Sequence, residues 1–252
     1  NDVDDWKDAL TLVGQLDDGK VKDSFLQDVE NGLLKSIELN PSNLNEDLLE
    51  NFLNIPIHAN LEGEYQVYLT DVLVKQGALT KPILEQVIET VDKVQEATNQ
   101  FKADPTQTNL TEYENTVKGL VDGNYKSSKE DKFPEMNLEM VVHYPTSMTA
   151  PALDTIGVTY DVNHIPHYQD FLAEYLKDVK KETITKVELQ LIIDVVNAVE
   201  QVKNNPTDDN IQRLNDLLAG LDPNAQIVKD TKQQVNGSIL DTINGDFTNV
   251  TE

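Results

Sequence analysis

The chain has 252 residues, of which 38% are hydrophobic, and no apolar run approaches the ~18 residues of a membrane span. Its 45 acidic residues against 20 basic residues give a formal charge of −25, which disfavours binding to nucleic acid and to anionic membranes. Cysteine is absent from the sequence, which excludes disulfides, thiolate zinc sites and cysteine nucleophiles.

The beginning of the chain predicts helices joined by turns. Residues 2–16 carry an apolar stripe at helical spacing, which places Trp6, the only tryptophan, on the buried side. A turn follows, and the stripe of the next helix consists of Val21, Phe25, Val29 and Leu33. Residues 42–54 are also predicted to be helical, as is the segment around residues 68–72.

Residues 79–121 predict two helices separated by a short turn. Apolar residues of the first recur three and four apart without alternation, which favours helix over strand. They are Leu84, Val87, Ile88, Val91, Val94 and Phe101. Thr80 and Pro82 suit the start of this helix, where a hydroxyl caps free amides and a missing N–H costs little. The second helix begins near Thr106, with a stripe of Leu110, Tyr113, Val117 and Leu120.

Residues 136–163 depart from this pattern. Apolar residues alternate with other residues in two stretches, 136–142 and 156–162. Alternation is typical of strands, so this segment favours a short β-hairpin. The matching segment at 42–54 reads as helix, and a segment that diverges between copies is where specific binding is expected.

Residues 184–221 repeat the helix pair of 79–121. LTKPILEQVIETVDKVQEATNQ (79–100) corresponds to ITKVELQLIIDVVNAVEQVKNN (184–205), and PTQTNLTEYENTVKGL (105–120) to PTDDNIQRLNDLLAGL (206–221). Thr185 and Glu188 predict a capping box at the start of this copy. Leu16, Leu120 and Leu221 align at spacings of 104 and 101 residues, which indicates an array with a period of about 100 residues.

A period of this length is too long for a solenoid unit, so each repeat is predicted to be a small helical-bundle domain. If Ser42 and Thr146 mark the starts, residues 1–41 are the C-terminal part of a preceding repeat and 42–145 are the first repeat. Residues 146–252 then hold the second repeat and the start of a next one, because 239–252 resembles 33–46. The first residue, Asn1, indicates excision from a longer chain.

The sequence predicts no enzyme. Patterns such as GxSxG, HExxH, GxGxxG and the phosphate loop are absent. Nucleophilic catalysis has no candidate, and the carboxylates are too numerous to nominate an acid–base pair. A hydrolase with an unrecognised carboxylate site is the third alternative for function.

No cofactor is predicted, but two metal hypotheses stay open. Asp161, His164 and His167 bring two histidines three residues apart beside a carboxylate, which is a zinc-ligand pattern that Pro166 disturbs. Calcium is the alternative at the acidic clusters Asp2/Asp4/Asp5, Asp17/Asp18 and Asp208/Asp209. Helix caps and turns explain the same acidic residues without a metal.

Tyrosines gather near the predicted repeat junctions. Tyr65, Tyr68, Tyr160, Tyr168 and Tyr175 either wedge one repeat against the next or form a contact surface, and the wedge is favoured. If they form a contact surface, its candidates are Tyr144, Tyr160, His164 and Tyr168.

The pattern LTxxxLxxVIDxVNxV…PTxxNLxxLxxLLxGL, carried by 184–221 and less cleanly by 79–120, resembles the helical repeat modules of Gram-positive cell-surface and S-layer proteins. A cysteine-free, lysine-rich, acidic composition fits an extracellular protein of such a bacterium, or a cytosolic protein. The resemblance implies an extracellular stalk, surface-layer or adhesive segment. Its partners would be a protein, a cell-wall polymer or other copies of itself. The alternative is a specific receptor- or ligand-binding domain that uses residues 133–167.

Overall fold

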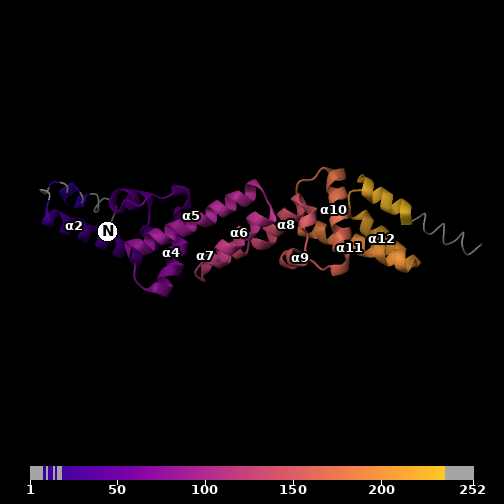
Figure 1. Cartoon of the computed structure of the whole chain (residues 1–252), viewed down its shortest axis with the longest axis horizontal. Helices are drawn as coiled ribbons and strands as arrows, with labels where there is room; N and C mark the ends of the chain where they lie inside the picture. Colours follow the sequence, from indigo (N-terminus) through magenta and orange to yellow (C-terminus); the bar gives the residue numbers. More distant parts are fainter. Residues whose placement is uncertain (1–7, 10, 14, 16–18, 236–252) are drawn as a thin grey trace, which may run out of the picture. The chain divides into compact units, whose positions relative to one another are not determined.

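The computed structural model describes residues 8–9, 11–13, 15 and 19–235, and its regular elements are helices (Figure 1). No strand occurs among these residues, so the predicted mainly α class is confirmed. None of the described helices is both long and apolar enough to cross a membrane. Trp6, the acidic clusters at 2–5 and 17–18, Leu16 and the match at 239–252 lie outside the described residues.

The chain divides into two compact units. Unit 1 comprises Asn1–Ala103 and Thr111–Asp131, and unit 2 comprises Asp104–Leu110 and Lys132–Glu252. The main division therefore falls at residues 131 and 132, whereas the predicted repeats change at 145 and 146. These boundaries differ in kind, because the phase of a repeat in sequence need not coincide with the edge of a compact unit.

Unit 1 contains two long amphipathic helices, Lys20–Leu39 and Lys81–Ala103. Its elements are α2 (Lys20–Leu39), η1 (Pro41–Asn43), α3 (Glu46–Leu48), η2 (Leu49–Leu53), η3 (Ala59–Leu61), α4 (Glu62–Gln76), α5 (Lys81–Ala103), most of α6 (Gln107–Lys118) and α7 (Asn124–Glu130). Helix α4 packs against α5, α7 and η1. The predicted stripe of α5 is buried, with Leu84, Val91 and Val94 at 0% exposure, so period-3.6 apolar spacing forms the core here.

Unit 2 has a similar order of elements. They are α8 (Phe133–His143), η4 (Pro145–Ser147), α9 (Ala150–Ile156), η5 (Val162–His164), α10 (Ile165–Val179), α11 (Lys186–Asn204) and α12 (Asp208–Ala219). Residues 226–235 are also helical. Helix α11 packs against α10 and α12, and α8 packs against α9.

The hairpin prediction for residues 136–163 is wrong. The buried residues of α8 include Met136, Met140 and Val141, which lie on one face of a helix. Positions four residues apart fit both a short alternation and a helix face, so the alternation did not distinguish strand from helix here. The second stretch, 156–162, begins at Ile156, the last residue of α9. Gly157 follows with a φ of 77° and reverses the chain. Thr159 then exchanges two hydrogen bonds with the side-chain amide of Gln190, at 2.7 and 2.9 Å, where a strand would use a backbone partner.

The predicted cap of α11 is half correct. The hydroxyl of Thr185 accepts a hydrogen bond from the backbone N–H of Glu188 at 3.1 Å. Instead of returning to the cap, the carboxylate of Glu188 accepts hydrogen bonds from the Tyr175 hydroxyl at 3.1 Å and from Lys181 Nζ at 2.7 Å. Glu188 therefore ties α11 to α10 and to the residues that follow α10.

Candidate functional site

Unit 2 contains a polar groove of about 600 Å³ beside α11. Its walls come from the connection between α9 and α10, from the second half of α11 and from α12. Five of its lining residues are amides, namely Asn197, Gln201, Asn204, Asn205 and Asn210. Three are carboxylates, Asp161, Asp194 and Glu200, and the others are Thr159, Tyr160, His164 and Arg213.

A buried tyrosine fixes the floor of this groove. Tyr168 of α10 is fully buried, and its hydroxyl accepts a hydrogen bond from the backbone N–H of Asp161 at 3.0 Å. The same hydroxyl donates to Oδ1 of Asn197 at 2.6 Å. One side chain therefore connects α10, the extended segment before it and α11.

The same contacts set the orientation of two groove side chains. His164 Nδ1 lies 2.9 Å from Oδ1 of Asn197, which also accepts from Tyr168. Because an amide oxygen can only accept, Nδ1 of His164 is the donor in this contact. Both contacts use Oδ1 of Asn197, so its Nδ2 donors are left for the groove.

Two further amides are oriented from α12. Arg213 donates from a terminal guanidinium nitrogen to Oε1 of Gln201 at 3.1 Å, which leaves the Gln201 amide nitrogen free to donate. Asn210 donates from Nδ2 to the backbone oxygen of Asn205 at 2.8 Å, which leaves its Oδ1 free to accept. The amides of the groove therefore present donors and acceptors in fixed positions.

The carboxylates at the groove are engaged with neighbouring groups. Glu200 accepts from Lys203 at 2.8 Å, and chiefly this hydrogen bond lowers the pKa of the Glu200 carboxyl. Asp161 accepts from the backbone N–H of Asn163 at 2.9 Å, which is the main cause of a lowered pKa for its carboxyl. Both groups are therefore ionised at neutral pH.

Asp161, His164 and His167 are not brought together as metal ligands. The rings of His164 and His167 lie nearly parallel with centroids 6.0 Å apart, and His167 faces Glu200 at 3.6 Å. The carboxylate of Asp161 caps η5. In the described part of the chain no group of three or more His, Cys, Asp or Glu side chains is placed to hold a metal ion. Asp208 and Asp209 lie in the first turn of α12.

The predicted contact residues are only partly gathered at the groove. Tyr160 and His164 line it, and Tyr168 lies buried beneath it. Tyr144 is elsewhere in unit 2, where it is 43% exposed and its hydroxyl donates to Asp104 at 2.9 Å. The amides of α11 and Arg213 of α12 were missed, because nothing in the spacing of uncharged polar residues indicates that they face a groove.

Unit 1 has a groove of about 410 Å³ in a corresponding place. Seven of its eight lining positions lie 103 or 105 residues before a lining position of the unit 2 groove. Tyr65 takes the role of Tyr168, because its hydroxyl accepts from the backbone N–H of His58 at 3.3 Å and donates to Asp92 at 2.5 Å. The side chains differ, with Leu61 in place of His164 and Glu96 in place of Gln201.

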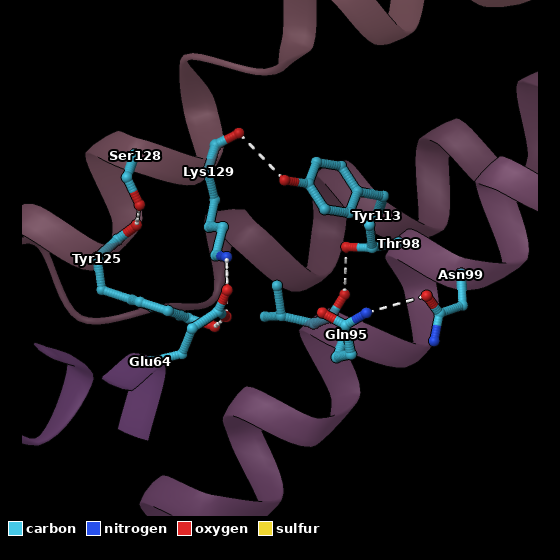
Figure 2. A network of polar contacts seen from close by, with 9 residues as sticks. Glu64, Gln95, Thr98, Asn99, Tyr113, Tyr125, Ser128 and Lys129 are labelled. Carbon is cyan, nitrogen blue, oxygen red and sulfur yellow. Dashed lines mark hydrogen bonds and ion pairs between the residues drawn. The ribbon is translucent and has the colours of Figure 1, made fainter. Parts of the chain in front are cut away.

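A second polar cluster in unit 1 was also missed from the sequence. Figure 2 shows the carboxylate of Glu64 between Tyr125 and Lys129, with the Tyr113 hydroxyl directed at the backbone carbonyl of Lys129. Glu64 accepts from the Tyr125 hydroxyl at 3.0 Å and from Lys129 Nζ at 2.9 Å. Lys129 Nζ also lies 4.9 Å from the centre of the Tyr125 ring. Glu64 with Tyr125 and Lys129 therefore holds α4 to α7, and Tyr113 ties α6 to α7.

Stability is expected to fall in alkaline solution because of these buried tyrosines. Burial, and secondarily the charge of Glu64, raises the pKa of Tyr113 to about 12 from an ordinary value of 10.0. A raised pKa means that the unfolded chain loses this proton first, so the stabilising contribution is complete below pH 10 and is lost towards pH 12. Two measurements between pH 10 and pH 12 check the expectation: the melting temperature, and the absorbance of tyrosinate, which reports ionisation. Tyr113→Phe should make the decline shallower, and full ionisation near pH 10 without loss of helix would contradict it.

Comparison with models of known protein families, with curated proteins and with solved structures finds no match to this chain.

Proposed function

We propose that the chain is a non-enzymatic structural or interaction segment of a secreted or cell-surface bacterial protein, built from tandem helical modules with a period of about 100 residues. Such a segment would serve as a stalk, a surface layer or an adhesive module. Its partner would be a protein, a cell-wall polymer or further copies of itself. The support comes from contacts that recur in the two units.

The tyrosine bridge is the observation that carries this proposal. Tyr65 and Tyr168 lie 103 residues apart, are both fully buried, and each joins a backbone N–H seven residues earlier to a side chain of the following long helix. A three-part contact of this kind needs the same arrangement of three segments. Its recurrence is therefore stronger support for a duplicated module than shared apolar spacing is.

Other local contacts recur at similar spacings. Gln66 donates to the backbone oxygen of Leu44 at 2.8 Å, and Gln169 donates to that of Met148 at 2.9 Å. Asn109 donates to the backbone oxygen of Asp104 at 2.7 Å, as Asn210 does to that of Asn205 at 2.8 Å. Helices α4 and α10 both have 15 residues and both end at a residue with positive φ.

The two copies also differ. The Glu64, Tyr125 and Lys129 cluster has His167, Ile227 and Thr231 at the corresponding positions of unit 2. Helix α11 packs closely along α12, whereas the backbones of α5 and α6 approach each other less closely. The modules thus share local connections but have separate polar clusters, as expected of copies that have specialised.

Force applied to the ends of the chain tests the modular proposal. A polypeptide held between two marker domains should unfold in separate steps, each releasing roughly 300–350 Å of chain, since about 100 residues extend by ~3.3–3.6 Å each. Weakening unit 2 alone should change the force of one step and leave the other unchanged. A single step that releases the whole chain would overturn the modular proposal.

Specific binding is the second candidate, and one observation favours it. Tyr160 and His164, from the segment that was expected to be specialised, line the larger groove together with oriented amides. This candidate keeps the non-enzymatic role and adds a defined site to unit 2.

A further inference from the structure

We propose that the groove of unit 2 binds an uncharged oligosaccharide, with Asn197, Gln201 and Asn210 as hydrogen-bonding groups and Tyr160 as an apolar wall. This inference rests on the interaction role proposed above and names the ligand class and the residues. It comes from the chemistry of the groove and from its difference from the groove of unit 1.

The hydrogen-bonding groups of the groove are neutral and preorganised. Asn197 is held by Tyr168 and His164, and Gln201 is held by Arg213, so each keeps an amide nitrogen available as a donor. Asn210 keeps its side-chain oxygen available as an acceptor. Sugar hydroxyls both donate and accept, so they can satisfy such a mixed set, and groups held in place lose little entropy when a ligand binds.

The charge of the groove argues against an anionic ligand. Asp161, Asp194 and Glu200 face it, and Arg213 is the only lysine or arginine among its lining residues. Lys203 is paired with Glu200. A phosphate or sulfate group would meet a surplus of negative charge there, whereas an uncharged polyol meets no such repulsion.

Tyr160 supplies an aromatic surface that is held in position. Its hydroxyl donates to Asp154 at 3.0 Å and approaches the backbone oxygen of Ala150 at 3.3 Å. The ring is partly exposed and lines the groove, and the C–H face of a sugar ring packs well on such a surface. At the corresponding position 103 residues earlier, unit 1 has Ile57, which is buried in its core.

The groove of unit 1 is a control within the same chain. It shares the tyrosine bridge and the course of the backbone, but its lining includes Leu61, Ala103 and Glu96 and contains neither an arginine nor a tyrosine. The inference therefore predicts sugar binding in unit 2 and none in unit 1.

Titration of the full chain with defined probes, followed by NMR of the Asn and Gln side-chain amides, tests the inference. The probes are uncharged tetrasaccharides of glucose and of N-acetylglucosamine, a sulfated oligosaccharide, and a lysine-rich peptide. At least one uncharged sugar should shift the amide signals of Asn197, Gln201 and Asn210 with a saturating curve and a Kd on the order of 1 mM or tighter. Saturation by the peptide or the sulfated probe alone, or by none of the four, would overturn the inference.

Matched variants locate the site. Gln201→Ala should weaken sugar binding by roughly fivefold, since one neutral hydrogen bond contributes about 1 kcal/mol. Glu96→Ala changes the corresponding position of unit 1 and should leave the affinity unchanged. Equal loss in both variants would assign binding to both grooves and refute the site as stated. Both positions are solvent-accessible, and equal melting temperatures verify folding. A failure to bind sugar leaves the stepwise unfolding of the modules intact, so the two proposals fail separately.

Discussion

Replacing Gly123 with alanine is expected to lower the free energy of unfolding by about 1–3 kcal/mol, although the residue lies in a turn. A Cβ atom at this position would lie 2.2 Å from Cγ of Asp71 and 2.4 Å from both of its carboxylate oxygens. The backbone at Gly123 has a φ of 170°, which any residue adopts, so the cost is a steric one. Chemical denaturation followed by circular dichroism measures it.

The collision is costly because Asp71 cannot easily move away. Its side chain on α4 is 7% exposed, and Oδ2 accepts a hydrogen bond from the backbone N–H of Tyr125 at 2.8 Å. This carboxylate thereby caps the start of α7, where the helix dipole favours a negative charge. Displacing it removes the cap and leaves a buried carboxylate without its partner.

Two further variants separate this mechanism from a general intolerance of alanine. Gly63→Ala in α4, where a Cβ atom would meet nothing within 4 Å, should be neutral or stabilising because alanine favours helix. Asp71→Ala combined with Gly123→Ala should cost less than the sum of the two single changes, because the collision disappears with the carboxylate. Strict additivity would contradict the proposed contact.

The sequence predicts the long helices of both units with their approximate ends. The apolar stripes of α5 and α11 span 18 residues (84–101) and 14 residues (189–202), and stripes of that length distinguish helical spacing from alternation. In α8 and at 156–162 the stretches are short. Four alternating positions fit a helix and a strand equally well, so the prediction there was wrong.

The hydrogen-bond partners of the buried tyrosines could not be predicted from the sequence. The sequence favours Tyr65, Tyr68, Tyr160, Tyr168 and Tyr175 as wedges between repeats, and all of these except Tyr160 are buried. Tyr65 and Tyr168, however, each form hydrogen bonds with partners within a single unit. Which partner a buried hydroxyl finds depends on the packing of segments 27–29 residues apart, and no local pattern encodes that.

The grooves are harder to predict from residue spacing than the helices are. Tyr160, Asp161 and His164 were singled out for chemistry and do line the groove of unit 2. Gln201 and Arg213 lie 12 residues apart on two helices, and they meet only because α11 and α12 pack side by side. Uncharged polar residues on an exposed helix face carry no periodic signal, so a binding surface made of them is visible only in the fold.

Replacing Ile192 with alanine is expected to have the largest effect on stability, a loss of about 2–5 kcal/mol in the free energy of unfolding. Ile192 is on the buried face of α11, a helix that packs against α10 and α12, and has no exposed surface. Truncation removes buried methyl groups and leaves a cavity that two packed helices cannot readily fill. Denaturant unfolding followed by circular dichroism gives the loss directly.

The neighbouring residues of α11 supply the controls. Leu191, which the apolar pattern places beside Ile192, is partly exposed and lies over Gly220, so Leu191→Ala should cost clearly less. Val187 is 77% exposed on the same helix, and Val187→Ala should be neutral or slightly stabilising because alanine has the higher helix propensity. The order Ile192, Leu191, Val187 follows from burial alone, and equal losses at the three positions would mean that α11 does not pack with this face towards the core.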